Sequence, residues 1–329
     1  MPLLCFRTRK TDWSCQLYAR EIGTIFIPTR GHRPRGTAHS IVKTETIIRI
    51  LTISALSGLL GAVGLRLTLG QVTEALKRSR FAAILIANFV VVPALTVAMA
   101  RAFELGRDIT IAMILLGAAP FAPVVPVFAR MAKADLPLAA GLTSIYPLFS
   151  AFLTPLACMF ALQSVTDANR IQFNLPVVLL TLIATITLPL AAGVFVNHRW
   201  PVFAKRLLRP AEITSEAIGA VSLAFVTFME FDFILQTGWR SLLAIVLVAE
   251  VSMLLGYFVG GPTTGSRRVV AFGTSNRNIA LALLVAIQSF AGTPVISGVV
   301  ANGLTIILLG LLHVAWWRFS PTATQSNGR

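Results

Sequence analysis

Long apolar runs dominate the chain from about residue 47 onward, and the charged residues fall in the short segments between them. A helix needs about 20 apolar residues to cross the hydrocarbon core of a bilayer. Because the runs are continuous rather than alternating at every second residue, they favour helices over a membrane barrel. Nine stretches reach or approach the required length and are predicted to span a membrane: 47–68, 81–103, 109–131, 136–162, 174–196, 212–235, 241–260, 268–290 and 294–317.

The composition supports this interpretation. Of the 329 residues, 56% are hydrophobic and 12% are charged, whereas soluble domains carry about 25% charged residues. The 28 basic residues exceed the 13 acidic ones, but they lie between apolar runs and do not indicate a nucleic-acid partner. The three cysteines, Cys5, Cys15 and Cys158, have no metal-ligand spacing. The sequence therefore predicts an all-α polytopic membrane protein.

The lysines and arginines of the short loops indicate how the helices are oriented. With nine spans, twelve of these residues fall on the side of the C-terminus and four on the opposite side. Cytoplasmic loops are enriched in Lys and Arg. The C-terminus is therefore predicted to be cytoplasmic and the N-terminus to lie outside, in a plasma or inner membrane.

Residues 1–46 are a separate basic segment with eight lysines and arginines and no apolar run long enough for a signal peptide. Two interpretations stay open: an arm that binds the membrane surface, or a disordered and dispensable extension. The second is favoured.

Two predicted spans are interrupted. Segment 109–131 contains Pro120, Pro123 and Pro126, and each proline removes a backbone donor and clashes with the preceding helical turn. Segment 268–290 has a polar centre at residues 273–278, which read Gly-Thr-Ser-Asn-Arg-Asn. Unwound backbone and polar side chains occur at membrane depth where protein or a water-filled cavity surrounds them. Both segments are predicted to be broken helices.

The interrupted segments occupy matching places in two halves, 47–162 with four helices and 174–317 with five, followed by a short tail, 318–329. A kink or a polar contact between helices would explain either segment alone. Interruptions at corresponding positions of two halves indicate the binding site of a transporter with inverted repeats.

Three stretches resemble the bile acid:sodium symporter family: VGLRLTLGQV (63–72), APFAPVVPVFARMAKADLPLAAGLTS (119–144) and SNRNIALALLVA (275–286). The resemblance covers roughly residues 50–317. It implies a core domain in which two broken helices cross near the midplane, a panel domain, and inverted repeats. It also implies the import of organic anions, such as bile salts or small carboxylates, driven by sodium.

The resemblance also implies where sodium ligands would lie, and most of these positions differ here. Four of them offer no side-chain oxygen: Val125, Pro126, Ala139 and Gly273, the last standing where the family has a glutamate. Thr143 is kept, Asn88 is an amide in place of a glutamine, and Arg277 replaces another glutamine. Because a fixed guanidinium repels a cation, we predict no sodium at these sites and no other cofactor or metal.

Arg277 is central to the predicted site. An arginine at a helix centre costs at least about 2.5 kcal/mol and needs a partner. Two interpretations stay open: its guanidinium replaces the missing ion and fixes the crossover through Asn276, Asn88 or Thr143, or it binds a substrate carboxylate or sulfonate as a fork. The candidate substrate-binding residues are Asn276, Arg277, Asn278, Thr274, Ser275, Asn88 and Thr143. The candidate crossover residues are Pro120, Pro123, Pro126 and Gly273.

If sodium is not the driving ion, a proton is the usual alternative. Glu250, within AIVLVAEVSMLLGY, is the candidate proton-coupling residue, and a structural contact with a neighbouring helix is its alternative role. The chain contains no HExxH or GxSxG motif and no cluster of histidines, so we do not expect an enzyme.

The sequence therefore predicts a secondary transporter that moves a small organic anion by alternating access, with the lipid bilayer as its other partner. Nothing in the sequence indicates an oligomeric state. One alternative is a proton-coupled or uncoupled facilitator or exporter of amphipathic acids. An alternative of another class is a membrane receptor or scaffold that does not transport.

Overall fold

The computed structural model describes residues 4–9, 12–16, 35–67, 70, 73, 76–77, 80–165 and 173–319. The chain divides into two compact units, Met1–Thr44 and Glu45–Arg329. In the first unit, β1 (Leu4–Arg9) and β2 (Asp12–Gln16) form an antiparallel hairpin, where the sequence analysis expects no regular element. Helix α1 (Arg35–Arg66) likewise begins before the predicted residue 47, because residues 37–46 contain no proline or glycine that would break it. The separation and disorder of residues 1–46 stay predictions.

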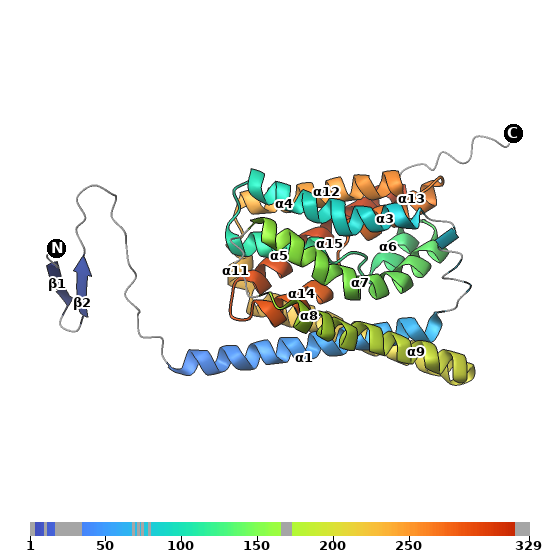
Figure 1. Ribbon diagram of the computed structural model, residues 1–329, viewed down its shortest axis with the longest axis horizontal. Coiled ribbons are helices and arrows are strands. Elements are labelled where there is room, and N and C mark those ends of the chain that lie inside the picture. The colour runs from blue at the N-terminus through green and yellow to red at the C-terminus, as the bar shows by residue number, and fades with distance from the viewer. Residues whose placement is uncertain are drawn as a thin grey trace. The chain divides into compact units, whose positions relative to one another are not determined.

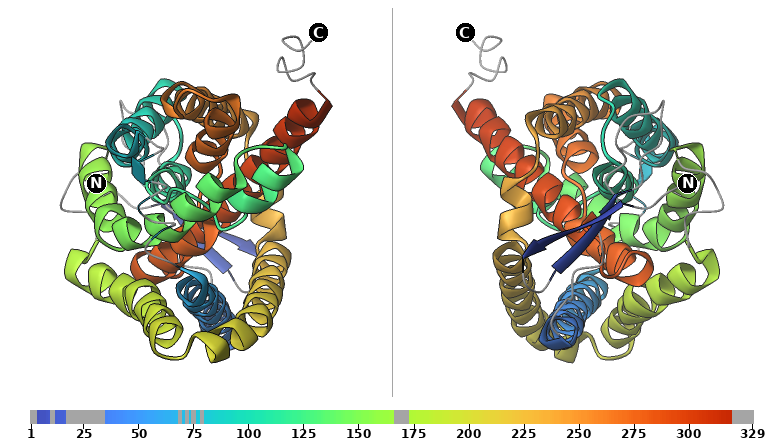
Figure 2. Two further views of the ribbon diagram at one scale, coloured as in Figure 1. Left: turned by 90° about the vertical axis from the view of Figure 1, so that its right-hand side faces the viewer. Right: turned by 90° about the vertical axis from the view of Figure 1, so that its left-hand side faces the viewer.

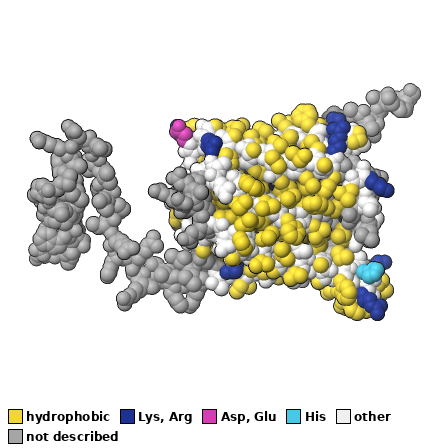
Figure 3. All heavy atoms as spheres, in the orientation of Figure 1, with side chains coloured by type: hydrophobic (Ala, Val, Ile, Leu, Met, Phe, Trp, Pro, Cys, Tyr) yellow, Lys and Arg dark blue, Asp and Glu magenta, His cyan; other side chains and the backbone are white. Residues whose placement is uncertain are grey.

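Eight helices in the described part of the chain are long and apolar enough to cross a membrane, which confirms the all-α polytopic class (Figure 1). Hydrophobic side chains cover the middle of the visible face, and Lys and Arg lie toward its two ends (Figure 3). After α1 the elements are α3 (Phe81–Ile86), η1 (Ala87–Val91), α4 (Val92–Ala102), α5 (Arg107–Gly117), α6 (Val125–Met131), α7 (Leu136–Val165), α8 (Leu175–Leu182), η3 (Ile183–Thr187), α9 (Leu188–Arg199), α10 (Pro201–Met229), α11 (Phe231–Leu235), α12 (Trp239–Val259), α13 (Thr264–Ser275), α14 (Ile279–Ser289) and α15 (Val295–Phe319).

The break in segment 109–131 agrees with the sequence prediction, whereas the start of α10 differs from it. The segment consists of α5 and α6, separated by seven non-helical residues, 118–124. Pro120 and Pro123 lie in that gap, whereas Pro126 lies in the first turn of α6, where a proline loses no helical hydrogen bond. Helix α10 begins at Pro201 rather than near residue 212. Its basic first turns are helical because Pro201 itself is a favourable helix start.

The helices of the second unit form two layers (Figure 2). We call α1, α8–α9 and α10 the panel, and α3–α7 and α12–α15 the core. In the panel, Gly64 of α1 packs directly on α9, and a Cβ atom at Gly64 would lie 2.2 Å from the carbonyl oxygen of Leu190. Pro189 has no N–H to offer the carbonyl of Thr185, and the hydroxyl of Ser57 donates to that carbonyl instead, at 3.1 Å.

The order of elements repeats along the chain. In the first half α1 and α3–α4 are followed by the broken pair α5/α6 and then α7, and in the second half α10 and α12 are followed by the broken pair α13/α14 and then α15. Because α1 and α10 are five membrane passages apart, an odd number, the two sets run in opposite directions. The pair α13/α14 is the most buried of the eight segments: 89% of its most apolar stretch is buried, against 17% for α10.

Candidate functional site

The two broken helices are joined to each other at their breaks. The backbone N–H of Phe121 donates to the carbonyl of Gly273 at 3.1 Å, and that of Ala122 donates to Asn276 at 3.1 Å. In return, the N–H of Asn278 donates to the carbonyl of Ala119 at 2.7 Å. Unwound backbone inside a membrane needs such partners, so each break stabilises the other. The predicted crossing of the two broken helices is therefore confirmed.

Side chains satisfy further backbone groups around the crossover. Thr154 of α7 donates to the carbonyl of Ala118 at 2.8 Å, and Ser275 donates to the carbonyl of Ala249 in α12 at 2.9 Å. The side chain of Asn278 accepts from the N–H of Leu281 at 3.1 Å and caps α14. These contacts fix the position of Arg277, which lies between Asn276 and Asn278 in the non-helical stretch.

Arg277 is buried, and both terminal nitrogens of its guanidinium lack hydrogen-bond partners among the described residues. The residue is 4% exposed, and the nitrogens without partners are Nη1 and Nη2. The buried Arg268 provides a contrast, since its Nη1 donates to the carbonyl of Ala132 at 3.1 Å and its guanidinium lies 5.5 Å from the centre of the Trp317 ring. Burying a cation whose donors lack hydrogen-bond partners is costly, and a guanidinium with two such donors has the chemistry to bind an anion.

A cavity of about 450 Å³ lies where the panel meets the crossover, within the range of small-molecule sites. Its walls are mainly apolar, with Leu56 and Leu59 from α1, Leu223 from α10 and Leu283 from α14. Its polar and charged lining residues are Thr52, Ser215, Glu216, Ser222, Asn276, Arg277 and Asn278. An apolar cavity with a few polar groups and one buried cation suits an amphipathic anion.

The predicted substrate-binding residues fall into two groups. Asn276, Arg277 and Asn278 line the cavity. The other four, Asn88, Thr143, Thr274 and Ser275, are buried but are not among its lining residues. Helix α13 continues to Ser275, which keeps Thr274 and Ser275 in its last turn rather than in the break. A substrate contact by these four residues stays a prediction.

Asn88 and Thr274 form a polar contact behind the crossover. The amide nitrogen of Asn88 lies 3.3 Å from Oγ1 of Thr274, 3.4 Å from the hydroxyl oxygen of Tyr146 and 2.8 Å from the carbonyl oxygen of Ile84. Asn88 lies in η1, where the wider helical turn precedes Pro93. The hydroxyl of Thr143 is buried without a hydrogen-bond partner among the described residues.

Gly273 lies in the last turn of α13, not in the break, and its missing side chain makes room for Phe121. A Cβ atom at Gly273 would lie 2.2 Å from two ring carbons of Phe121. That ring stacks on Tyr146 with 3.9 Å between the ring centres. Phe121 has a left-handed backbone, with φ of 57°, an uncommon conformation for a bulky residue. An aromatic ring therefore fills the space beside Gly273.

Glu250, the predicted proton-coupling residue, does not line the cavity. Its Oε2 lies 3.2 Å from Nε2 of His313 in α15, and Nδ1 of His313 lies 2.9 Å from the carbonyl oxygen of Leu309. The pair links α12 to α15, which is the structural role that the sequence left open. Whether it also carries a coupled proton stays a prediction.

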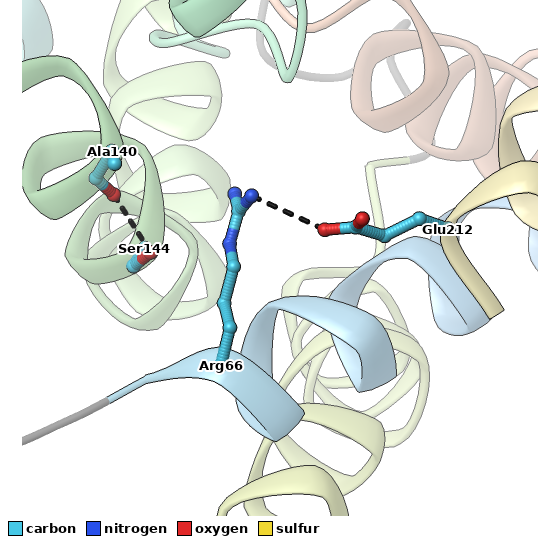
Figure 4. Close-up of polar contacts among 4 residues, drawn as sticks. All are labelled: Arg66, Ala140, Ser144 and Glu212. Carbon is cyan, nitrogen blue, oxygen red and sulfur yellow. Dashed lines mark hydrogen bonds and ion pairs between the residues drawn. The ribbon is translucent and has the colours of Figure 1, made fainter. Parts of the chain in front are cut away.

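The sequence analysis missed the polar residues of α10. Glu212 forms an ion pair with Arg66 at 3.2 Å, and Figure 4 shows the two side chains pointing toward each other from α10 and α1. Ser144 of α7, in the same view, donates to the carbonyl of Ala140 in its own helix. One turn after Glu212, Glu216 lines the cavity. The sequence could have indicated these residues, because a carboxylate within a membrane-spanning helix is costly unless it faces a partner or a cavity.

Comparisons of the sequence with known proteins identify its family and relatives. A profile described as the Sodium Bile acid symporter family matches residues 52–237. The Sodium-dependent organic anion transporter of Mus musculus is 24% identical over 255 residues, which are 74% of this chain and 66% of the relative. The Ileal sodium/bile acid cotransporter of Homo sapiens is 21% identical over 210 residues, which are 62% of this chain and 59% of the relative. The chain thus spans less than two thirds of the length of these relatives.

Proposed function

The chain belongs to the sodium bile acid symporter family, and we propose that it is a secondary transporter, not an enzyme, that carries an amphipathic organic anion by alternating access. The observation that supports this most directly is that Arg277, whose Nη1 and Nη2 have no hydrogen-bond partner among the described residues, is among the lining residues of an apolar cavity of about 450 Å³. The relatives named for organic anions and bile acids point to the same substrate class.

In this proposal Arg277 binds the acidic head of the substrate, and the apolar walls contact its body. A guanidinium can hold a carboxylate or sulfonate through two parallel hydrogen bonds. The N–H groups that lack partners in the substrate-free protein would then be satisfied. The anion also brings a negative charge into direct contact with the buried cation.

Both layers contribute to the cavity, which supports a rocking movement of one layer against the other. Thr52 and Ser222 of the panel line it, and so do Pro123, Arg277 and Ile306 of the core. A displacement of the panel would therefore open the cavity toward one side of the membrane and then the other. The loop charges favour a cytoplasmic C-terminus for this cycle.

We further propose that the transporter works without sodium at the family's usual positions. Sodium requires oxygen ligands and, in this family, a carboxylate where Gly273 stands. Here the ring of Phe121 occupies the space that a side chain at Gly273 would need. Arg277 adds a fixed positive charge at the same crossover. The residues present therefore do not fit a sodium ion, and no step of the proposed cycle depends on one.

Filling the cavity tests this proposal. We expect Ala220→Phe to lower the affinity for taurocholate, a bile salt with a sulfonate head, by about tenfold or more, because Ala220 lines the cavity and a clash there costs about 1–3 kcal/mol. Ala217→Phe is the matched control, since Ala217 is an exposed residue of the same helix that does not line the cavity. Binding is measured on the purified full chain in choline chloride. No binding by the unmodified chain, or equal binding by both variants, would contradict the proposal.

A further inference from the structure

Glu216 is an exposed carboxylate in the middle of a membrane-spanning helix. It lies at the sixteenth of the 29 residues of α10, Pro201–Met229. A charged side chain at the bilayer centre that faces lipid is costly, and such residues usually face a water-filled cavity. Glu216 is among the lining residues of the cavity at the crossover, so its position agrees with that rule.

Two charged residues line this cavity, Glu216 from the panel and Arg277 from the core. The surrounding parts of α1, α6, α14 and α15 contribute neutral lining residues. The nearest charge along α10 is that of Glu212, and Arg66 of α1 neutralises it at 3.2 Å. Among the described residues, the carboxylate of Glu216 has no ion pair or hydrogen bond. His198 and Arg199 lie in the last turn of α9, before α10 begins at Pro201.

We propose, on the basis of the function proposed above, that Glu216 binds the proton that is transported together with the organic anion. Without the anion, the two charged lining residues, an ionised Glu216 and Arg277, sum to a net charge of zero. When the anion binds Arg277, a proton from the same aqueous side adds to an oxygen of the Glu216 carboxylate and makes a neutral acid. The net charge of the cavity is zero before and after. Release of both ions on the opposite side restores the carboxylate.

The coupling follows from electrostatics in a cavity with apolar walls. Without a proton, the bound anion and the Glu216 carboxylate would repel each other across a medium that screens weakly. Protonation removes this repulsion, so proton binding strengthens anion binding and anion binding strengthens proton binding to the same extent. One proton taken up per anion makes the affinity for the anion rise as the pH falls, by up to about tenfold per pH unit.

Glu250 fits this role less well than Glu216. It lies outside the lining of the cavity, and its carboxylate already contacts His313 at 3.2 Å. Glu250→Gln is therefore a suitable control for an intramembrane carboxylate away from the bound anion.

The test uses the full chain in proteoliposomes without sodium, with the membrane potential clamped and taurocholate as the probe. The sulfonate of taurocholate stays ionised across the pH range. A proton that moves together with taurocholate is therefore bound by the protein and not by the substrate. An inward proton gradient is expected to drive accumulation of taurocholate by the unmodified chain and by Glu250→Gln. Glu216→Gln is expected to show no such accumulation, and its affinity for taurocholate should no longer vary with pH.

A second measurement is independent of any substrate. Infrared difference spectra of the purified chain between high and low pH should show the carbonyl stretches of protonated carboxylic acids, and the band of the Glu216 acid is the component that should be lost in Glu216→Gln. A missing band in the unmodified chain, or a band unchanged in Glu216→Gln, would overturn the assignment of Glu216. Accumulation by Glu216→Gln equal to that of the unmodified chain would overturn it as well. A band that is lost in Glu216→Gln without any taurocholate binding would leave the proton site standing and contradict the proposed substrate.

Discussion

Replacing Arg277 by glutamine is expected to weaken taurocholate binding by about tenfold to a hundredfold, because a hydrogen bond to a charged group contributes about 1.5–3 kcal/mol and a factor of ten is about 1.4 kcal/mol. The same change is expected to raise the thermal unfolding temperature of the substrate-free protein. Arg277 is 4% exposed, and its Nη1 and Nη2 have no partner among the described residues. A buried neutral amide costs less than a buried unpaired cation.

The opposite signs of these two effects make Arg277→Gln informative. If Arg277 only held the crossover together, its loss would lower the unfolding temperature. Arg268→Gln is the matched control, because Arg268 is also buried but donates to the carbonyl of Ala132 and lies over Trp317. That variant is expected to unfold at a lower temperature while its affinity for taurocholate stays the same. Unchanged binding by Arg277→Gln would remove Arg277 from the substrate site.

Gly273→Ala is expected to destabilise the protein by about 1–3 kcal/mol, as added atoms in a well-packed interior do. The new Cβ atom would lie 2.2 Å from two carbons of the Phe121 ring. The ring has little room to move, because its other face stacks on Tyr146 at 3.9 Å. Thermal unfolding of the purified variant measures the effect.

Gly61→Ala provides the control, since the atom nearest to its added Cβ would be the carbonyl oxygen of Pro189 at 3.8 Å, an ordinary contact. We expect no loss of stability there. Adding Phe121→Ala to Gly273→Ala should give a smaller loss than the sum of the two single changes, because the removed ring is what the new methyl group meets. Additive losses in the double variant would mean that Phe121 does not fill the space beside Gly273.

The breaks in the two central helices could be predicted from the sequence because their cause is local. Pro120 and Pro123 prevent a regular helix wherever the segment lies, and a polar run at residues 273–278 is costly in a membrane unless it is covered or lines a site. The first and last residues of the helices were harder to predict from the sequence. The sequence analysis began α10 near residue 212, because the basic residues between Pro201 and that point resemble a loop, although they lie in a helix that Pro201 starts.

The lining of the site depends on which helices face one another, and hydropathy does not specify this. Thr274 and Arg277 are three positions apart and both polar, yet Thr274 contacts Asn88 behind the crossover while Arg277 lines the cavity. The end of α13 at Ser275 separates them. Glu216 is another example, since its role depends on α10 lying opposite the crossover. The filling of the space beside Gly273 by Phe121 depends on a contact between two segments about 150 residues apart in the sequence.

The central claim, that an organic anion binds at Arg277 without sodium, is tested most directly by one equilibrium measurement. Taurocholate binding to the purified full chain is titrated in sodium chloride and in choline chloride at equal ionic strength and equal pH. We expect the same dissociation constant in both salts, because neither Gly273 nor Arg277 offers a side-chain oxygen to a cation. Binding that appears only in sodium chloride, or that is tighter there by about tenfold or more, corresponding to about 1.4 kcal/mol, would contradict it and restore sodium as the coupling ion.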